Sequence, residues 1–213
     1  MQPKNKNLPI QYKAGVTYFC ETPFFVNKHV LIPRFDTEVL VEATILKLKN
    51  GARVLDMCTG SGCIAVIHAK HGFNVTAADI SHKALKVARK NALLNDVNIH
   101  FVRSDLFNAI EGVFDAIVCN PPYVKTNEIG LQDASTLHEP RIALDGGTDG
   151  LDFYRRIASS AHRYLHDGGL LAFEIGYSQA DEVQNILREK VFCDINVIKD
   201  HLGHNRVITC TKN

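Results

Sequence analysis

The chain lacks a charge excess of either sign, an apolar run long enough to cross a membrane, and any low-complexity linker. Its 24 Lys and Arg residues nearly balance 23 Asp and Glu residues, so the whole molecule has no net attraction for nucleic acid or for an anionic membrane. Residues 1–7 are polar rather than signal-like. We therefore expect a cytoplasmic protein, and its 213 residues are enough for one domain with a sizeable core.

The sequence also lacks the cysteine pairs that hold zinc. Its six cysteines include no Cys-x-x-Cys pair and mostly lie in apolar, strand-like runs, which predicts buried reduced thiols rather than disulfides. They are Cys20, Cys58, Cys63, Cys119, Cys193 and Cys210.

Three histidine pairs have the spacing of metal ligands: His68 and His71, His162 and His166, and His201 and His204. The second pair would lie one turn apart on the polar face of a helix, with no third ligand nearby in the sequence, and a solvated face is the better interpretation. We expect no metal site.

From Arg53 onward, strand-like and helix-like segments alternate, which predicts a parallel sheet with helices on both faces. Helices are predicted at about 61–70, after an N-cap at Ser81, near Gly150, and from Ser178, where Asp181 completes a capping-box pattern. The expected strands are 53–57, 73–79, 98–103, 114–119, 169–175, 191–198 and 205–211.

The N-terminal part has a different pattern. Residues 8–33 alternate as extended structure broken by Gly15 and by Thr22-Pro23, which predicts a β-hairpin. Asp36 is the expected N-cap of a following helix, and Gly51 is its expected end. We accordingly divide the chain into a hairpin and linker at 1–35 and a main domain at 36–213.

The stretch Asn120-Pro121-Pro122-Tyr123 follows an apolar run, residues 114–119, that is typical of a buried parallel strand. Two successive prolines cannot continue a sheet, so the chain is expected to leave at the carboxyl edge, where open α/β sheets bind ligands. Asn120 would present one acceptor and two donors there, with Tyr123 close behind. Taken alone, the stretch is equally compatible with simple turn chemistry.

A second strand leads into a glycine-rich turn. Gly60 and Gly62 permit a tight turn and a close approach of the backbone to a ligand, and Asp79 at the end of the next strand suits the two hydroxyls of a ribose. After the third strand, Asp105 offers a carboxylate for an adenine amino group, and Leu106 offers an apolar surface for its faces.

The charge before the glycine turn bears on the choice of cofactor. Gly60-x-Gly62-x-x-Ala65 also satisfies the dinucleotide pattern, so a nicotinamide or flavin cofactor is the alternative. Asp56, however, ends the strand immediately before the turn and would oppose a pyrophosphate. S-adenosylmethionine has no phosphate and carries positive charge on its ammonium and sulfonium groups, so the sign of the charge favours it.

These motifs resemble the amino-group methyltransferases of the class I, Rossmann-like fold, in which a mostly parallel sheet has helices on both faces. Outside the motifs, residues 31–38, 139–151, 174–176 and 200–207 are similar to the PrmC/HemK family, here with a short β-hairpin before the main domain. That family methylates the side-chain amide of glutamine in the Gly-Gly-Gln motif of peptide chain release factors, and so acts in translation termination.

The resemblance implies roles for individual residues. Asn120, Pro121 and Tyr123 are the expected catalytic residues, and Asn120 through Tyr123, including Pro122, would hold the substrate amide. The expected contacts of S-adenosylmethionine are Asp56, Cys58, Thr59, Gly60, Ser61, Gly62, Asp79, Ile80, Asp105, Leu106 and Asn120.

Two departures from the family pattern stand out. Phe35 occupies a position that is usually proline, and the chain begins almost at the hairpin, so we expect the family's N-terminal helical domain to be absent. Two other functions compete with the release-factor interpretation. A DNA or RNA base amino-group methyltransferase would need a basic, aromatic-lined path, which the near-neutral charge and residues 139–151 do not favour. A non-catalytic nucleotide-binding module would not need both Asn120 and Asp79.

Overall fold

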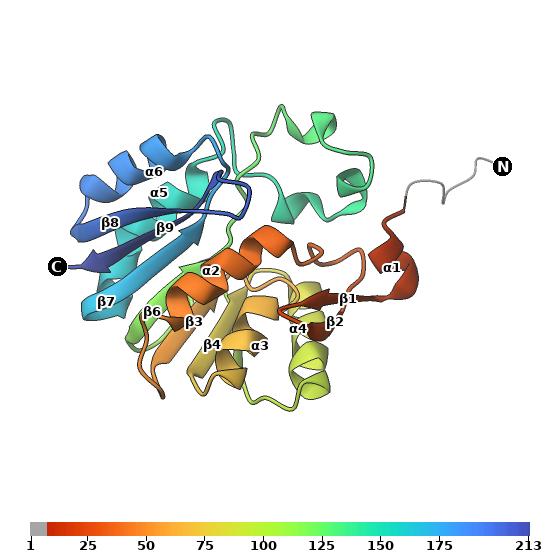
Figure 1. The fold of residues 1–213 in the computed structure, drawn as a ribbon, viewed down its shortest axis with the longest axis horizontal. Helices are drawn as coiled ribbons and strands as arrows, with labels where there is room; N and C mark the ends of the chain where they lie inside the picture. The colour runs from red at the N-terminus through yellow and green to blue at the C-terminus, as the bar shows by residue number, and fades with distance from the viewer. Residues whose placement is uncertain (1–7) are drawn as a thin grey trace.

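A computed structural model describes residues 8–213, so the polar segment 1–7 lies outside the described residues. Within residues 8–213 the chain forms a seven-stranded sheet in the order β5-β4-β3-β6-β7-β9-β8, parallel except for β9, which runs antiparallel to β7 and β8 (Figure 1). The predicted strands are confirmed, with ends that differ by a few residues. They are β3 (Arg53–Met57), β4 (Asn74–Asp79), β5 (His100–Arg103), β6 (Phe114–Cys119), β7 (Leu165–Glu174), β8 (Phe192–Lys199) and β9 (Asn205–Lys212).

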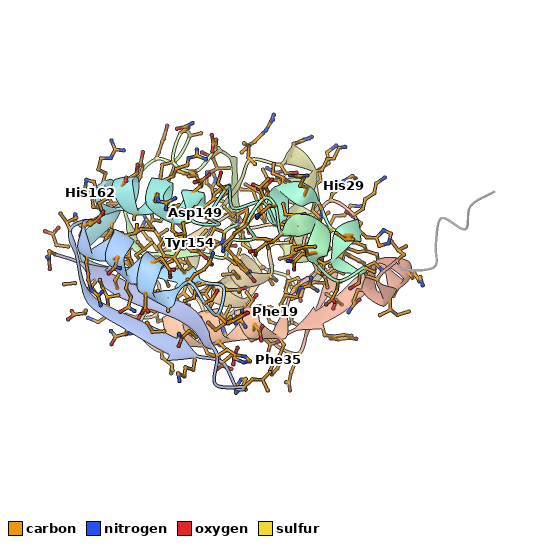
Figure 2. The ribbon with its side chains drawn as sticks, turned by 90° about the horizontal axis from the view of Figure 1, so that it is seen from above. Phe19, His29, Phe35, Asp149, Tyr154 and His162 are labelled. Carbon is orange, nitrogen blue, oxygen red and sulfur yellow. The ribbon has the colours of Figure 1, made fainter. Side chains whose placement is uncertain are left out.

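Helices cover both faces of this sheet, as predicted. Successive strand residues point to opposite faces, and Val54 and Leu55 of β3 accordingly belong to two different clusters of buried side chains. Val54 packs with α2 (Phe35–Ile45), α3 (Cys63–Lys70) and the N-terminal hairpin, whereas Leu55 packs with α5 (Asp152–Ala161) and α6 (Ala180–Arg188). Tyr154 of α5, labelled in Figure 2, is completely buried against the second face.

The strand order places a crevice beside β3. The chain builds β3, β4 and β5 outward on one side and then crosses to the other side of β3 to form β6. Ligands of open α/β sheets bind at the carboxyl ends of the strands where the order reverses in this way. Residues 58–62 follow β3 and residues 120–123 follow β6, so both predicted motifs lie at this edge.

The N-terminal hairpin is confirmed as β1 (Val16–Phe19) and β2 (Thr22–Phe25). The prediction of extended structure throughout residues 8–33 was wrong at Ile10–Ala14, which form the short helix α1. Gly15 ends this helix in the left-handed region, at φ 73°, where its N–H donates to the Gln11 carbonyl. The alternation pattern assigned these residues to a strand, but they form a single helical turn that a left-handed glycine ends.

Both predicted ends of α2 were wrong. The helix starts at Phe35 without a side-chain cap and ends at Ile45, before Gly51. The Asp36 carboxylate does not cap it, because it lies 3.2 Å from the guanidinium of Arg206 on β9. The Asp36 side chain, which local propensity predicts as the N-cap of α2, therefore forms a long-range ion pair instead.

The predicted N-cap of α4 (His82–Leu94) is confirmed, since the Ser81 hydroxyl accepts a hydrogen bond from the Ala84 N–H. The predicted cap at Ser178 was wrong: α6 begins at Ala180, after Gln179, whose side-chain oxygen accepts from the Gly176 N–H.

Helix α5 ends at Ala161, so His162 lies in a following 3-10 turn and His166 lies in β7. The prediction that the two share a helix face was therefore wrong. Figure 2 shows His162 at the periphery, far from His29, which lines the cavity described below.

The long segment 124–148 has structure of its own. It contains three 3-10 turns, η1 (Ile129–Leu131), η2 (Thr136–His138) and η3 (Arg141–Ala143). The Val124 N–H donates to the Leu144 carbonyl at 2.9 Å, and the Gly146 N–H donates to the Val124 carbonyl at 2.8 Å, which ties the two ends of the segment together. In Figure 1 the segment is green and extends over the N-terminal elements, beyond the carboxyl edge of the sheet.

Candidate functional site

A cavity of about 210 Å³ opens at the carboxyl ends of β3, β4, β5 and β6. It brings together most of the residues that the sequence assigned to the cofactor and the substrate. Four assigned residues are not part of the cavity lining within the described residues 8–213: Asp56, Gly62, Pro121 and Tyr123. The predicted residues that do line it are Cys58, Thr59, Gly60, Ser61, Asp79, Ile80, Asp105, Leu106, Asn120 and Pro122.

Asp56 lies beneath the glycine turn and is completely buried. Its Oδ2 accepts from the Thr59 hydroxyl at 2.5 Å and from the Ala65 N–H at 3.1 Å, so the carboxylate holds the turn from below. Burial raises the pKa of Asp56 to about 7, and these two hydrogen bonds oppose the shift. Asp56 Oδ1 has no hydrogen-bond partner within residues 8–213.

Asp79 braces the other side of the turn. Its Oδ2 accepts from the Gly60 N–H at 2.9 Å and its Oδ1 accepts from the Ser81 N–H at 2.8 Å. A carboxylate oxygen has two lone pairs, so each oxygen keeps one that can accept from a hydroxyl in the cavity. Burial raises the pKa of Asp79, and the two N–H bonds oppose that shift. The side chain therefore shapes the turn and still offers two acceptors to a diol.

Backbone strain occurs at two cavity-lining positions. Cys58 has φ 60° and Leu106 has φ 48°, a region that non-glycine residues rarely adopt. Such residues persist where the surrounding structure over-determines them, and they gather at ligand sites. The sequence contains no signal for this strain, because neither residue type favours it.

Asp105 lines the cavity and also pairs with Arg156 of α5, whose guanidinium lies 2.7 Å from Asp105 Oδ1. About half of each side chain is exposed, so solvent screens this pair. Asp105 is thus a more solvated acceptor than Asp79.

Gly62, the N-cap of α3, has φ 82°, and an added Cβ would lie 2.9 Å from the Cβ of Ala88 on α4. We expect Gly62→Ala to lower the free energy of unfolding by about 1–3 kcal/mol, because it adds a clash to an unfavourable backbone angle. Urea unfolding measures the effect. Gly51→Ala is the matched control, since Gly51 has φ 79° but open space around its Cα. Equal losses for the two variants would contradict the close packing of α3 on α4.

Asn120 is linked to the buried acid Glu174 through Thr37, and Tyr123 is linked to it directly. Asn120 Nδ2 donates to Thr37 Oγ1 at 3.3 Å, and Thr37 Oγ1 lies 2.6 Å from Glu174 Oε2. The Tyr123 hydroxyl lies 3.4 Å from Glu174 Oε1. The resemblance led us to expect Tyr123 among the residues that hold the substrate amide, whereas Tyr123 does not line the cavity among the described residues and its hydroxyl donates to Glu174.

Glu139, to which the sequence assigned no individual role, ties the cavity-lining residues that follow it to the segment before α2. The Glu139 carboxylate is nearly inaccessible to solvent, accepts from the Ile32 N–H at 3.0 Å and lies 2.5 Å from the Arg34 guanidinium. This pairing anchors η3, whose Ile142 lines the cavity and is half exposed. Both partners lie in segments that carry the family resemblance, but no sequence pattern indicates that segments so far apart will pair.

Within residues 8–213, no three His, Cys, Asp or Glu side chains gather closely enough to hold a metal ion. No helix in that range is long and apolar enough to cross a membrane. All six cysteines are free thiols. The prediction that they are buried is confirmed for Cys63, Cys119 and Cys210 and was wrong for Cys20, Cys58 and Cys193, which are partly exposed.

Comparisons with known proteins agree with this geometry. A family model described as "Methyltransferase small domain" matches residues 33–139. The release factor glutamine methyltransferase of Thermodesulfovibrio yellowstonii is 45% identical over 216 residues, covering 97% of this chain and 77% of that protein. The protein of the same name from Geobacter sulfurreducens is 42% identical over 207 residues, covering 95% of this chain and 73% of that protein.

Two solved structures share the fold. A methyltransferase from Pyrococcus furiosus superposes with a TM-score of 0.72 at 19% identity, covering 96% of this chain and 95% of that chain. The E. cuniculi Mtq2-Trm112 complex, described as responsible for methylating the translation termination factor eRF1, superposes with a TM-score of 0.64 at 23% identity. It covers 87% of this chain and 99% of that chain.

Proposed function

Since this chain belongs to the family of release factor glutamine methyltransferases, we propose that it transfers a methyl group from S-adenosylmethionine to the glutamine of the Gly-Gly-Gln motif in peptide chain release factors. The acceptor is the side-chain amide nitrogen. One observation carries the proposal: Asn120 and the glycine turn line the same cavity, at the edge of the sheet where the strand order reverses. A methyl donor and an amide would therefore meet in one enclosed space.

The cavity residues suit S-adenosylmethionine, which supplies an electrophilic methyl group on a sulfonium when bound. Asp79 has two free lone pairs for the ribose hydroxyls, and Ile80 and Leu106 offer apolar surface for the adenine. Acidic groups, Asp56 beneath the turn and Asp79 beside it, favour a cation over a pyrophosphate. The proposed contacts are Cys58, Thr59, Gly60, Ser61, Asp79, Ile80, Asp105, Leu106 and Asn120, with Asp56 and Gly62 shaping the turn.

The amide nitrogen of glutamine is a poor nucleophile, because its lone pair is delocalised into the carbonyl. In our proposal, the Asn120 side-chain oxygen and the Pro121 carbonyl accept its two N–H bonds and hold the nitrogen in line with the methyl group. These acceptors favour the positive charge that develops on the nitrogen. The nitrogen becomes acidic only as it is methylated, so its proton passes to solvent without a general base. Pro122 makes this carbonyl edge rigid.

The setting of the reaction follows from the substrate. We propose that the protein acts in the cytoplasm on a release factor rather than on nucleic acid. We further propose that residues 36–213 form the methyltransferase domain and that residues 1–35, of which 1–7 lie outside the described residues, are a hairpin and linker attached to it.

Radiolabelled methyl transfer tests the proposal against the nucleic-acid alternative. Purified wild-type protein would be incubated with labelled S-adenosylmethionine and, separately, with a release factor, ribosomal RNA or DNA. We expect label in the release factor, and none when its Gly-Gly-Gln glutamine is replaced with alanine. Label in RNA or DNA and none in the release factor would overturn the proposal.

Replacing Asp79 with asparagine is expected to weaken S-adenosylmethionine binding about tenfold to a hundredfold, because an NH₂ group would face a backbone N–H and one ribose acceptor would be lost. Calorimetry measures the affinity. Asp105→Asn is the matched control, since Asp105 lines the same cavity but is half exposed and paired with Arg156. A larger loss of affinity in Asp105→Asn than in Asp79→Asn would contradict the assigned ribose site.

A further inference from the structure

A series of hydrogen bonds connects Asn120 to two buried residues, Thr37 and Glu174, that have no role in the mechanism described so far. It joins Asn120, Thr37 in the first turn of α2, Glu174 at the end of β7, and Tyr123. Thr37 is 2% exposed and lines the cavity beside Asn120, whereas Glu174 is 1% exposed and does not line it among the described residues. A buried carboxylate is costly unless its hydrogen bonds are worth more than its lost hydration, so this acid is an unusual residue to find behind a binding site.

The chemistry of the carboxylate sets the direction of every hydrogen bond in this series. An ionised carboxylate only accepts, so the Thr37 hydroxyl must donate to Glu174, at 2.6 Å. Because its one hydrogen is used in this bond, Thr37 Oγ1 can only accept a further hydrogen bond. Asn120 must therefore turn its NH₂ group toward Thr37. The side-chain oxygen of Asn120 is then the end that remains for a ligand in the cavity.

We propose that Thr37 and Glu174 are positioning residues that orient the Asn120 amide, so that its oxygen rather than its NH₂ group meets the N–H bonds of the substrate amide. This proposal rests on the proposed function and deepens it. If the Asn120 amide were rotated, its NH₂ group would face the N–H bonds of the substrate amide. The substrate nitrogen would then lose one of the two acceptors that align it. Tyr123 completes the arrangement, because its hydroxyl donates to the other oxygen of Glu174.

The orientation depends on the ionisation of Glu174. Burial raises its pKa to about 7, while the Thr37 hydroxyl and the Arg206 guanidinium oppose that shift. A protonated Glu174 can donate to Thr37, whose hydroxyl is then free to donate to the oxygen of Asn120 and rotate that amide. The charged or titratable groups that pack around Glu174 from neighbouring elements are Asp36, Tyr123, Tyr154, Asp200 and Arg206.

The sign of the effect follows from these facts. Because the pKa of Glu174 is raised, the ionised form that orients Asn120 is present above about pH 7 and is lost as the pH falls through that value. We expect kcat to fall over that range. The folded state takes up the proton more readily than the unfolded state, so acidification favours folding through this group while it lowers kcat. A purely structural role would not produce these opposite trends.

Paired threonine variants make the first test. Thr37→Val removes the hydroxyl at nearly constant volume and is expected to lower kcat about tenfold to a hundredfold through misplacement of the amide, with S-adenosylmethionine affinity retained. Thr37→Ser restores the hydroxyl and is expected to restore most of kcat. Thr44→Val is the matched control: Thr44 lies on the same helix, is completely buried and hydrogen-bonds to His68. Wild-type kcat in Thr37→Val, or an equal loss in Thr44→Val, would overturn the proposal.

The second test follows Glu174, which does not line the cavity among the described residues and so acts only through its neighbours. The side-chain amide signals of Asn120 in an ¹⁵N spectrum, assigned by their loss in Asn120→Asp, are expected to shift with a midpoint near pH 7 in the wild type and to lose that midpoint in Glu174→Gln. Signals that do not change between about pH 4 and 9, or a midpoint that persists in Glu174→Gln, would overturn the proposal.

The two tests also separate the positioning proposal from the proposed function. The amide transition needs no substrate, so a protein that shows it and methylates no release factor would contradict the function and support the positioning. Equal methylation of a release factor by the wild type and by Thr37→Val would support the function and contradict the positioning.

Discussion

Asn120→Ala is expected to lower kcat for methyl transfer by about a hundredfold to a thousandfold, the scale found when one preorganised polar contact to the reacting group is removed. The variant loses the side-chain oxygen that accepts from the substrate amide, and the Pro121 carbonyl alone cannot fix the nitrogen in line. Steady-state transfer to a release factor measures kcat. The affinity for S-adenosylmethionine, measured by calorimetry, is expected to change much less, because the ribose and adenine sites lie elsewhere in the cavity.

A second asparagine provides the control. Asn108 is exposed, lies after β5 and does not line the cavity among the described residues, so Asn108→Ala is expected to keep both kcat and cofactor affinity. Transfer near the wild-type rate in Asn120→Ala would remove Asn120 from the mechanism. A loss of cofactor affinity as large as the loss of kcat would instead assign Asn120 to cofactor binding.

Gly146→Ala is expected to impair catalysis about a hundredfold without contact with either ligand. An added Cβ at Gly146 would lie 2.7 Å from Tyr123 Cα and 2.8 Å from the Pro122 carbonyl oxygen. Both are backbone atoms that cannot rotate away, so the Asn-Pro-Pro-Tyr backbone must shift, and misplacement of about 1 Å at a reacting centre costs on the order of a hundredfold in rate. The measurement is kcat, with unfolding by urea followed in parallel.

Gly130 is the matched control for this prediction. It lies in the same segment, neither glycine has a positive φ, and an added Cβ at Gly130 would meet nothing within 4 Å. Gly130→Ala is expected to keep wild-type kcat and stability. If Gly146→Ala kept the same kcat as Gly130→Ala, the contact between the segment 124–148 and the Asn-Pro-Pro-Tyr stretch would not matter for catalysis.

Local patterns in the sequence were sufficient for the central part of the fold. The apolar runs predict the strands, and the two-proline stretch predicts where β6 ends. The Ser81 cap could be predicted because the N–H that it accepts from, that of Ala84, is only three residues away in the sequence. At the start of α2 the local rule failed because a distant residue had taken the side chain. Asp36 pairs with Arg206 instead of capping α2. Such pairings depend on the completed fold, and no window of sequence contains both partners.

The segments that carry the family resemblance outside the cofactor motifs meet around one site. Thr37, Glu139, Glu174 and Arg206 come from four separate segments, and each contacts another of these segments or the Asn-Pro-Pro-Tyr stretch. The sequence showed that these segments belong to the pattern but not what they do. The structure indicates that Glu139 ties its segment to the residues before α2, and that Thr37 and Glu174 form a hydrogen-bonded series with Asn120.

The most direct test of the proposed function is the chemical position of the transferred methyl group. A release factor incubated with the wild-type protein and S-adenosylmethionine would be digested and analysed by tandem mass spectrometry. We predict one added methyl group on the side-chain nitrogen of the glutamine in the Gly-Gly-Gln peptide, and an unmodified peptide when Asn120→Ala replaces the wild type. A methyl group at another residue, or an unmodified peptide with the active wild-type protein, would contradict the account.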